Sequence, residues 1–187
     1  MKIAVYSGSF NPLHIGHQAI MEYLSHSEIC DWIYLVVSPK NPLKDSISAE
    51  SGDERYEAAV KALERHMDLH VWVDDIELNM PAPQYTIKTL DALKEREPLN
   101  DFILVIGADN LAGIRRWRDY RRILREYGVV VYPRKGFDLE EIKLQLVQED
   151  PADSYKIEII EAPEVDISST EIREGIASGR DMSEWLM

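Results

Sequence analysis

Short runs in which nearly every residue is apolar alternate along the chain with longer stretches in which apolar residues recur at helical spacing. The short runs predict six strands buried on both faces, at residues 3–7, 32–37, 69–76, 101–106, 129–132 and 156–160. The longer stretches predict helices at 16–25, 53–66, 86–97, 139–147 and 170–177, an arginine-rich helix before residue 129, and a short helix after Asp181.

This alternation predicts an α/β fold with helices on both faces of a parallel sheet. Because crossover connections are right-handed, a doubly wound, Rossmann-like sheet is the expected architecture. Its ligands should bind at the carboxyl ends of the strands, which directs attention to the loops after the first, fourth and sixth strands. The 187 residues, 45% of them hydrophobic, suit a single domain over 1–187. We expect about residues 163–187 to form a small helical subdomain within it.

The charge and composition exclude several classes of function. A formal net charge of −13 argues against a nucleic-acid-binding surface, which would be basic. No apolar run approaches the roughly 18 residues of a membrane span, and the chain opens on a strand pattern without a signal peptide. The single cysteine, Cys30, excludes an internal disulfide and fits a reducing compartment. We expect a cytoplasmic protein that binds neither nucleic acid nor membranes.

Basic residues nevertheless gather in one segment. Between residues 113 and 135 eight cations stand against two carboxylates. A solvated basic helix face is the first interpretation, and the pattern does not separate substrate capture from self-association as further roles. The sequence therefore leaves the oligomeric state, including a homo-oligomer, open.

The loop after the first strand has the features of a phosphate site. It reads Ser-Gly-Ser-Phe-Asn-Pro-Leu-His-Ile-Gly-His over residues 7–17. A Gly-Ser turn leaves backbone N–H groups accessible, and the start of a helix attracts phosphate. His14 and His17, three residues apart, can point to one side of that helix end. The alternatives are surface histidines or a metal pair, and zinc would need further ligands that the other histidines do not supply.

This loop resembles the signature of the HxGH nucleotidyltransferases, which are related to class I aminoacyl-tRNA synthetases. A synthetase is not expected, because the chain is too short for tRNA-binding parts and has no Lys-Met-Ser-Lys-Ser loop. The resemblance implies that His14 and His17 stabilise charge on the α- and β-phosphates of ATP. It also implies ATP contacts from the rest of the loop, at Gly8, Ser9, Phe10 and Gly16.

A second segment, Ile-Ser-Ser-Thr-Glu-Ile-Arg at residues 167–173, opens the last predicted helix. Ser168 with Glu171 three residues on is a capping box, which by itself could explain the sequence. The segment also matches the second signature of the same family. The resemblance implies that Arg173 is catalytic and that the β- and γ-phosphates bind at Ile167, Ser168, Ser169, Thr170 and Arg173.

Three further segments resemble bacterial nicotinate-nucleotide adenylyltransferases. The stretch at residues 83–90 contains Tyr85 and Thr86, whose backbone in that family receives the nicotinate carboxylate; read structurally, Thr86 is a helix N-cap. Gly107 and Asp109 match a Gly-Ala-Asp motif near the nucleotide ribose. Trp117 matches a tryptophan that stacks on the pyridine ring, although a core tryptophan would look the same.

Basic residues facing the acceptor phosphate are expected at Lys40 or Lys44, and at Arg134. The sequence around the two lysines departs from the family's commoner Pro-His-Arg, so it does not show which of them contacts the acceptor phosphate. Lys135 stands where the family has proline, Asn11 where aspartate is common, and Ser7 where a first glycine is common.

The resemblance covers nearly the whole chain. It implies transfer of AMP from ATP to nicotinate mononucleotide, giving deamido-NAD and pyrophosphate, with Mg²⁺ carried by the ATP phosphates and no metal site made by the protein alone. The alternatives are the same chemistry on nicotinamide mononucleotide or phosphopantetheine, cytidylyl transfer to a polyol phosphate, and a non-catalytic nucleotide sensor.

Overall fold

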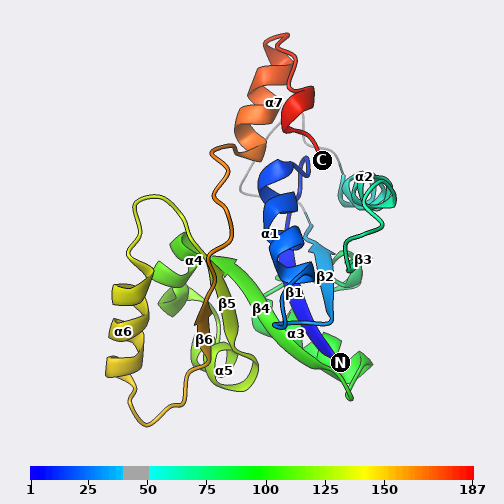
Figure 1. Cartoon of the computed structure of the whole chain (residues 1–187). Coiled ribbons are helices and arrows are strands. Elements are labelled where there is room, and N and C mark those ends of the chain that lie inside the picture. The colour runs from blue at the N-terminus through cyan, green and yellow to red at the C-terminus, as the bar shows by residue number, and fades with distance from the viewer. Residues whose placement is uncertain (40–50) are drawn as a thin grey trace.

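Six parallel strands form one sheet in the order β3-β2-β1-β4-β5-β6 in the computed structural model, which describes residues 1–39 and 51–187 (Figure 1). The strands are β1 (Lys2–Gly8), β2 (Trp32–Val37), β3 (Val71–Asp74), β4 (Asp101–Gly107), β5 (Val129–Tyr132) and β6 (Ile157–Ile159). Successive strands are added towards one edge of the sheet from β1 to β3 and towards the other edge from β4 to β6, so the loops after β1 and β4 border a crevice. The predicted doubly wound parallel sheet is confirmed.

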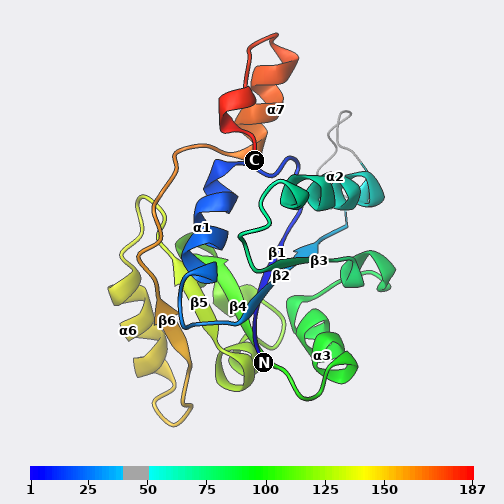
Figure 2. The same cartoon turned by 45° about the vertical axis from the view of Figure 1, so that its right-hand side comes forward.

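The longer helices are α1 (Ile15–Ser25), α2 (Gly52–Glu64), α3 (Thr86–Arg96), α6 (Leu139–Glu149) and α7 (Ser169–Ala177). Apolar residues of α1 and α2 join one core cluster, and those of α3 and α6 join another. The two views show helices on both faces of the sheet (Figures 1 and 2). This is the arrangement that strands with two apolar faces require.

The alternation along β1 shows how one strand serves both cores. Ala4 and Tyr6 belong to the cluster under α1 and α2, whereas Ile3 and Val5 belong to the opposite one. Side chains point to opposite faces in turn along a strand. All four are at most 4% exposed, so both faces of β1 are buried.

The arginine-rich segment is not one helix, and that prediction was wrong. It consists of α4 (Ala108–Ala112), a 3-10 turn η2 (Ile114–Arg116), the short α5 (Tyr120–Arg122) and a π-helical turn η3 (Ile123–Tyr127). Asp119, at φ 51°, breaks the run in the left-handed region.

The arginines of this segment serve mainly to connect elements. Arg115, Arg121 and Arg125 pair with Glu149, Asp150 and Asp153 at the end of α6 and just beyond it. Arg122 reaches Asp91 of α3. These pairs are partly exposed, so each contributes little to stability, but they leave fewer cations free to attract a ligand.

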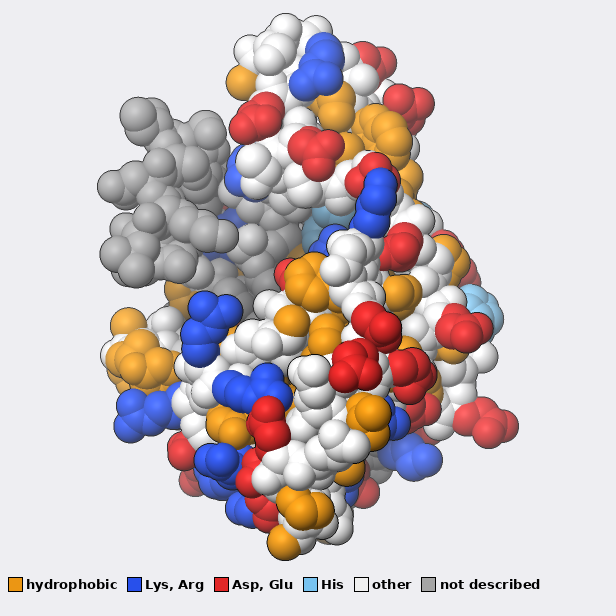
Figure 3. Space-filling view, turned by 90° about the vertical axis from the view of Figure 1, so that its left-hand side faces the viewer, with side chains coloured by type: hydrophobic (Ala, Val, Ile, Leu, Met, Phe, Trp, Pro, Cys, Tyr) orange, Lys and Arg blue, Asp and Glu red, His pale blue; other side chains and the backbone are white. Residues whose placement is uncertain are grey.

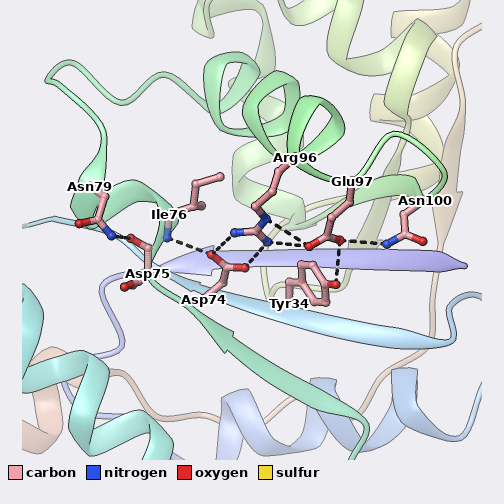
Figure 4. A network of polar contacts seen from close by, with 8 residues as sticks. All are labelled: Tyr34, Asp74, Asp75, Ile76, Asn79, Arg96, Glu97 and Asn100. Atoms are coloured by element: carbon pink, nitrogen blue, oxygen red, sulfur yellow. Dashed lines mark hydrogen bonds and ion pairs between the residues drawn. The ribbon is translucent and has the colours of Figure 1, made fainter.

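A separate polar network joins α3 to the sheet (Figure 4). Arg96 at the end of α3 donates to both oxygens of Asp74, at 3.2 and 2.6 Å, and Asp74 is 2% exposed. Glu97 accepts hydrogen bonds from the Tyr34 hydroxyl and from Asn100, each at 2.9 Å. The network fixes the C-terminal end of α3 against β2 and β3.

The last residues stand above the carboxyl edge of the sheet, where α7 packs beside a 3-10 turn η4 (Ser183–Trp185) (Figure 2). They have a small core of their own around Ile167, Ile172 and Met182. A subdomain at 163–187 stays a prediction. Across residues 1–39 and 51–187, no helix has the length and apolar character needed to cross a membrane.

Candidate active site

Both histidines of the first loop are held by backbone groups at the start of α1. His14 is the N-cap, and its Nδ1 accepts from Gly16 N at 3.0 Å; the Nδ1 of His17 accepts from His14 N at 3.1 Å. A ring nitrogen that accepts carries no proton, so each neutral imidazole must hold its proton on Nε2. The fold thereby sets the tautomer and leaves two Nε2–H donors.

Gly16 is required by this arrangement. A Cβ on Gly16 would lie 2.8 Å from the His14 ring. Without one, the ring packs over the helix start and stacks on His17 with a centroid separation of 3.7 Å. Gly16 therefore provides room for the histidine pair as well as for a ligand.

The two rings are uncharged at neutral pH. Burial lowers the pKa of His14 to about 4, and the nearby Arg134 contributes to the decrease. The pKa of His17 is also lowered well below its usual value, by burial first and then by His14 and Arg134. Two adjacent imidazolium ions beside an arginine would repel one another. The site therefore offers neutral donors that become stronger when an anion arrives.

A cavity of about 560 Å³ opens over these rings. Its polar lining includes His14, His17, Asp109 and Arg134, and its apolar lining includes Ile20 and Val165. Figure 3 shows histidine atoms in a hollow between the C-terminal helices and the body of the molecule. Its size and mixed lining are typical of a small-molecule site.

Phe10, predicted to contact ATP, has its side chain elsewhere. It is 5% exposed and packs edge-on against Tyr6 and His17, at centroid separations of 5.3 and 5.1 Å. A Cβ on Gly8 would lie 3.2 Å from the Phe10 ring. The Phe10 ring therefore packs against His17 and helps to hold it in place. Ser9 presents its carbonyl to Arg55 at 2.7 Å, which fixes the turn.

The second predicted segment meets the first loop directly. Ser169 of α7 donates to Pro12 O at 2.9 Å, and the Arg173 guanidinium donates to Asn11 O and Thr170 Oγ1. Two stretches more than 150 residues apart in the sequence thus form one surface. Of this segment, only Ile167 borders the cavity itself.

Ser168 behaves as the capping alternative predicted. Its Oγ accepts from Glu171 N at 3.1 Å and donates to Glu171 Oε1 at 2.9 Å. The hydroxyl is engaged within its own helix turn, so it would have to exchange these bonds to contact a phosphate.

The predicted acceptor residues form a separate cluster. Tyr85 and Trp117 pack against the same core, and the Arg118 guanidinium lies over the Tyr85 ring at 5.1 Å from its centroid. Thr86 is not the N-cap of α3, as its residue type had suggested: the cap is Tyr85, and it makes no side-chain capping bond. Backbone N–H groups therefore carry any anion binding here. Lys40 and Lys44 lie outside the described residues.

Arg134 lies with the histidines and not with this cluster. It borders the cavity and is 3.9 Å from Asp109. Burial opposes its charge, but Tyr132 and Asp109 outweigh burial and raise the pKa of Arg134 above its usual value. Gly107 has no free space for a side chain, because a Cβ would lie 2.6 Å from the Asp109 carboxylate and 3.0 Å from the Tyr132 ring.

Several lining residues escaped the sequence interpretation. Tyr6 and Tyr132 look like ordinary strand residues, and the stretch from Ala162 to Asp166 has no recognisable pattern. The sequence interpretation also missed Glu77, a buried carboxylate that is not part of the cavity lining. Glu77 accepts from Ser7 Oγ at 2.8 Å at the carboxyl edge of the sheet, and burial raises its pKa. The only available signal was position: Tyr6 lies near the end of β1, whose following loop was already suspected, and Tyr132 ends β5, two residues before Arg134.

Metal ligation by protein side chains alone has no support within residues 1–39 and 51–187. No group of three or more His, Cys, Asp or Glu side chains there is placed to hold an ion. Asp109 is the carboxylate nearest to Arg134 in the cavity wall.

Comparison with known proteins agrees with the geometry. A cytidylyltransferase-like family model matches residues 5–175. The probable nicotinate-nucleotide adenylyltransferase of Flavobacterium johnsoniae is 37% identical over 186 residues, covering 100% of this chain and 92% of that protein. Its counterpart in Porphyromonas gingivalis is 38% identical, covering 100% and 89%.

A solved structure shares the fold. The nicotinic acid mononucleotide adenylyltransferase of Plasmodium falciparum, complexed with NaAD, aligns with a TM-score of 0.80 and 19% identity, covering 99% of this chain and 90% of that chain. At that identity the likeness concerns the fold alone. The family model and the full-length relatives confirm the resemblance first indicated by the two phosphate-binding segments: the chain belongs to the cytidylyltransferase-like family and, within it, to the nicotinate-nucleotide adenylyltransferases of NAD biosynthesis.

Proposed function

We propose that this chain transfers AMP from Mg-ATP to nicotinate mononucleotide. An oxygen of the acceptor's 5′-phosphate attacks the α-phosphorus, the bond from that phosphorus to the bridging oxygen breaks, and pyrophosphate leaves. The attacking oxygen is already anionic, so no general base is needed. Catalysis then consists of alignment and stabilisation of charge. The observation that carries the proposal is the pair of Nε2–H donors at one cavity, His14 and His17.

The phosphate roles follow from two segments, the loop after β1 with the start of α1, and the start of α7, which form two walls of the proposed site. His14 and His17 would donate to oxygens of the α- and β-phosphates as negative charge builds there. Ser169, Thr170 and Arg173 would receive the leaving pyrophosphate, with Ser168 joining if it releases Glu171. Gly8, Ser9 and Gly16 would supply backbone contacts, and Asp109 the ribose contact.

The acceptor roles are assigned to the cluster at α3. Trp117 would stack on the pyridine ring, and the N–H groups at Tyr85 and Thr86 would hold the carboxylate. Lys40 or Lys44 would face the acceptor phosphate. Arg134, from its place beside the histidines, would meet the phosphates of both substrates where they join.

The proposed cation is Mg²⁺, bound through the ATP phosphates. When bound it would neutralise part of the phosphate charge and polarise the reacting phosphorus. The chain's own part is to orient the triphosphate with neutral donors and the Arg134 and Arg173 guanidinium groups.

Pyrophosphate release tests the proposal. Purified protein with Mg-ATP and nicotinate mononucleotide should release pyrophosphate, and nicotinamide mononucleotide or phosphopantetheine should support a lower kcat/KM. Release favouring another acceptor would change the substrate, and no release with any acceptor would leave a nucleotide sensor.

His17→Ala tests the catalytic role. Removing one donor aimed at developing charge should lower kcat by roughly 10²–10³. His66→Ala, a histidine that does not line the cavity, serves as the control and should keep its activity. A loss below tenfold in His17→Ala would remove His17 from the catalytic groups.

A further inference from the structure

Two tyrosines share the wall of the cavity and have no role in the reaction described so far. Tyr6 lies near the end of β1 and Tyr132 is the last residue of β5, with β4 between these strands. Both border the cavity that contains His14, His17 and Arg134. Their rings meet edge to face with a centroid separation of 6.2 Å.

The intervening strand is shaped to admit this pair. Gly107 of β4 lies opposite Tyr132 in the sheet register. Any Cβ at this glycine would come within 3.0 Å of the Tyr132 ring. The missing side chain lets the ring extend across β4 towards Tyr6. Three strands therefore cooperate to place two phenols at the carboxyl edge.

The Tyr6 and Tyr132 hydroxyls differ in their partners from three other tyrosine hydroxyls of the described residues. Those of Tyr34, Tyr127 and Tyr155 donate to carboxylates at 2.6 to 2.9 Å. In residues 1–39 and 51–187, neither Tyr6 nor Tyr132 donates to a carboxylate or a backbone carbonyl, although they are only 4% and 8% exposed. Phenylalanine would fill the same space without a polar atom. The Tyr6 and Tyr132 hydroxyls share a hydrogen bond, and that of Tyr132 also meets Arg134. The shared bond uses one of the two hydroxyl protons, so the pair keeps a further donor, and its place at the cavity wall indicates an acceptor on the ligand.

The electrostatic setting suits an anionic ligand. Burial and the neighbouring Tyr132 raise the pKa of Tyr6 well above its usual value, so its hydroxyl keeps its proton. The Arg134 guanidinium lies over the Tyr132 ring, with Cζ 5.4 Å from the centroid. This part of the wall thus presents neutral donors beside one stacked cation, and the lining also includes Lys135 and the carboxylates Asp109, Glu164 and Asp166. Phosphate oxygens are the acceptors that match this set.

We propose that Tyr6 and Tyr132 bind phosphate oxygens of the nucleotide through their hydroxyls, and that the Tyr132 ring positions Arg134 by stacking. The nature of the nucleotide rests on the proposed function. The contact itself follows from the placement of the two phenols beside the histidines and Arg134.

The test compares three isosteric substitutions: Tyr6→Phe, Tyr132→Phe and, on the neighbouring strand β2, Tyr34→Phe as the control. Each removes one hydroxyl. Calorimetry would measure the Kd of Mg-ATP and of adenosine, which has the same base and ribose without phosphates. We expect Tyr6→Phe and Tyr132→Phe each to weaken Mg-ATP about tenfold, with adenosine within twofold. Tyr34→Phe should change neither Kd.

An unchanged Kd for Mg-ATP in both site variants, or an equal loss for ATP and adenosine, would overturn the proposal. Tyr132→Leu adds a second criterion, because it removes the ring as well as the hydroxyl. It should weaken Mg-ATP several-fold beyond Tyr132→Phe, with unfolding followed in parallel to confirm a folded protein. A loss equal to that of Tyr132→Phe would refute the positioning of Arg134.

These measurements need no acceptor, so they separate the two proposals. A wild-type protein that binds Mg-ATP but releases no pyrophosphate with nicotinate mononucleotide would contradict the proposed function and leave the tyrosine assignment to be judged by the variants. A wild-type protein that binds no Mg-ATP would overturn both.

Discussion

Backbone contacts fix the tautomer of His14 and His17, and burial keeps both rings uncharged. Each Nδ1 accepts a backbone N–H, and both rings lie near Arg134. A permanently charged pair would bind phosphate tightly in the ground state as well as in the transition state. Neutral donors interact more weakly with the substrate and more strongly as charge develops, which is the difference that accelerates a reaction.

A pH dependence of stability follows at the same scale. The folded-state pKa of His14 is about 4, below its unfolded value, and that of His17 is also lowered. Between about pH 6.5 and 4 the unfolded chain binds protons that the folded protein does not, so the unfolding free energy should fall as the pH falls. His14→Asn keeps a capping acceptor but does not titrate. Urea unfolding from pH 7 to 4.5 should give a shallower decrease for this variant. Equal slopes would show that folding does not lower the pKa of His14.

The sequence predicted these residues well when a motif was local. Spacing alone placed His14 and His17 at a helix start. It could not show that Phe10 packs beneath His17 or that Ser168 bonds to Glu171, because both depend on the path of the loop. Tyr6 and Tyr132 become neighbours only through sheet order, which brings together residues 126 positions apart in the numbering.

Among the elements, the strands were predicted most accurately and the arginine-rich segment least. Apolar runs such as that of β2 leave little ambiguity, and its bounds agree with the prediction at both ends. The segment after β4 lacks a continuous apolar stripe, and Asp119 interrupts it. Its arginines find partners on α3 and around the end of α6, and sequence spacing does not reveal such contacts between elements.

The network at the end of α3 gives a test of how elements are joined. Asp74→Asn removes the charge from the nearly buried partner of Arg96 and weakens the bidentate ion pair between the two side chains. Because the Arg96 side chain is 40% exposed, the expected loss is moderate, about 1–2 kcal/mol of unfolding free energy. Asp101→Asn applies the same change to a carboxylate whose side chain is 89% exposed and 3.7 Å from Lys94, and should cost little. Equal losses in the two variants would show that the network contributes nothing.

For the whole molecule, the net charge of −13 contrasts with a site for anionic substrates. Most arginines of the basic segment pair with carboxylates on neighbouring elements, whereas Arg134 lies at the cavity beside the histidines. Local donors and Arg134 then bind the ligand, while the overall field opposes loose association with other polyanions.

Ligand binding should stabilise the entire fold. Mg-ATP would contact both the first loop and α7, so opening either wall would release it. At a concentration of 100 Kd the gain in unfolding free energy should be about 2.7 kcal/mol. Thermal unfolding with increasing Mg-ATP would measure it, and a Tm independent of nucleotide would contradict binding at this site.

The bonds from Ser169 to Pro12 and from Arg173 to Asn11 have a consequence for how the protein is made. A chain still being synthesised exposes the histidine motif early, but the partner segment emerges about 155 residues later. During that interval the growing polypeptide has half of a nucleotide pocket and little means of retaining ATP. Nucleotide capture would therefore follow the meeting of these two segments, and it would favour molecules in which both have been made.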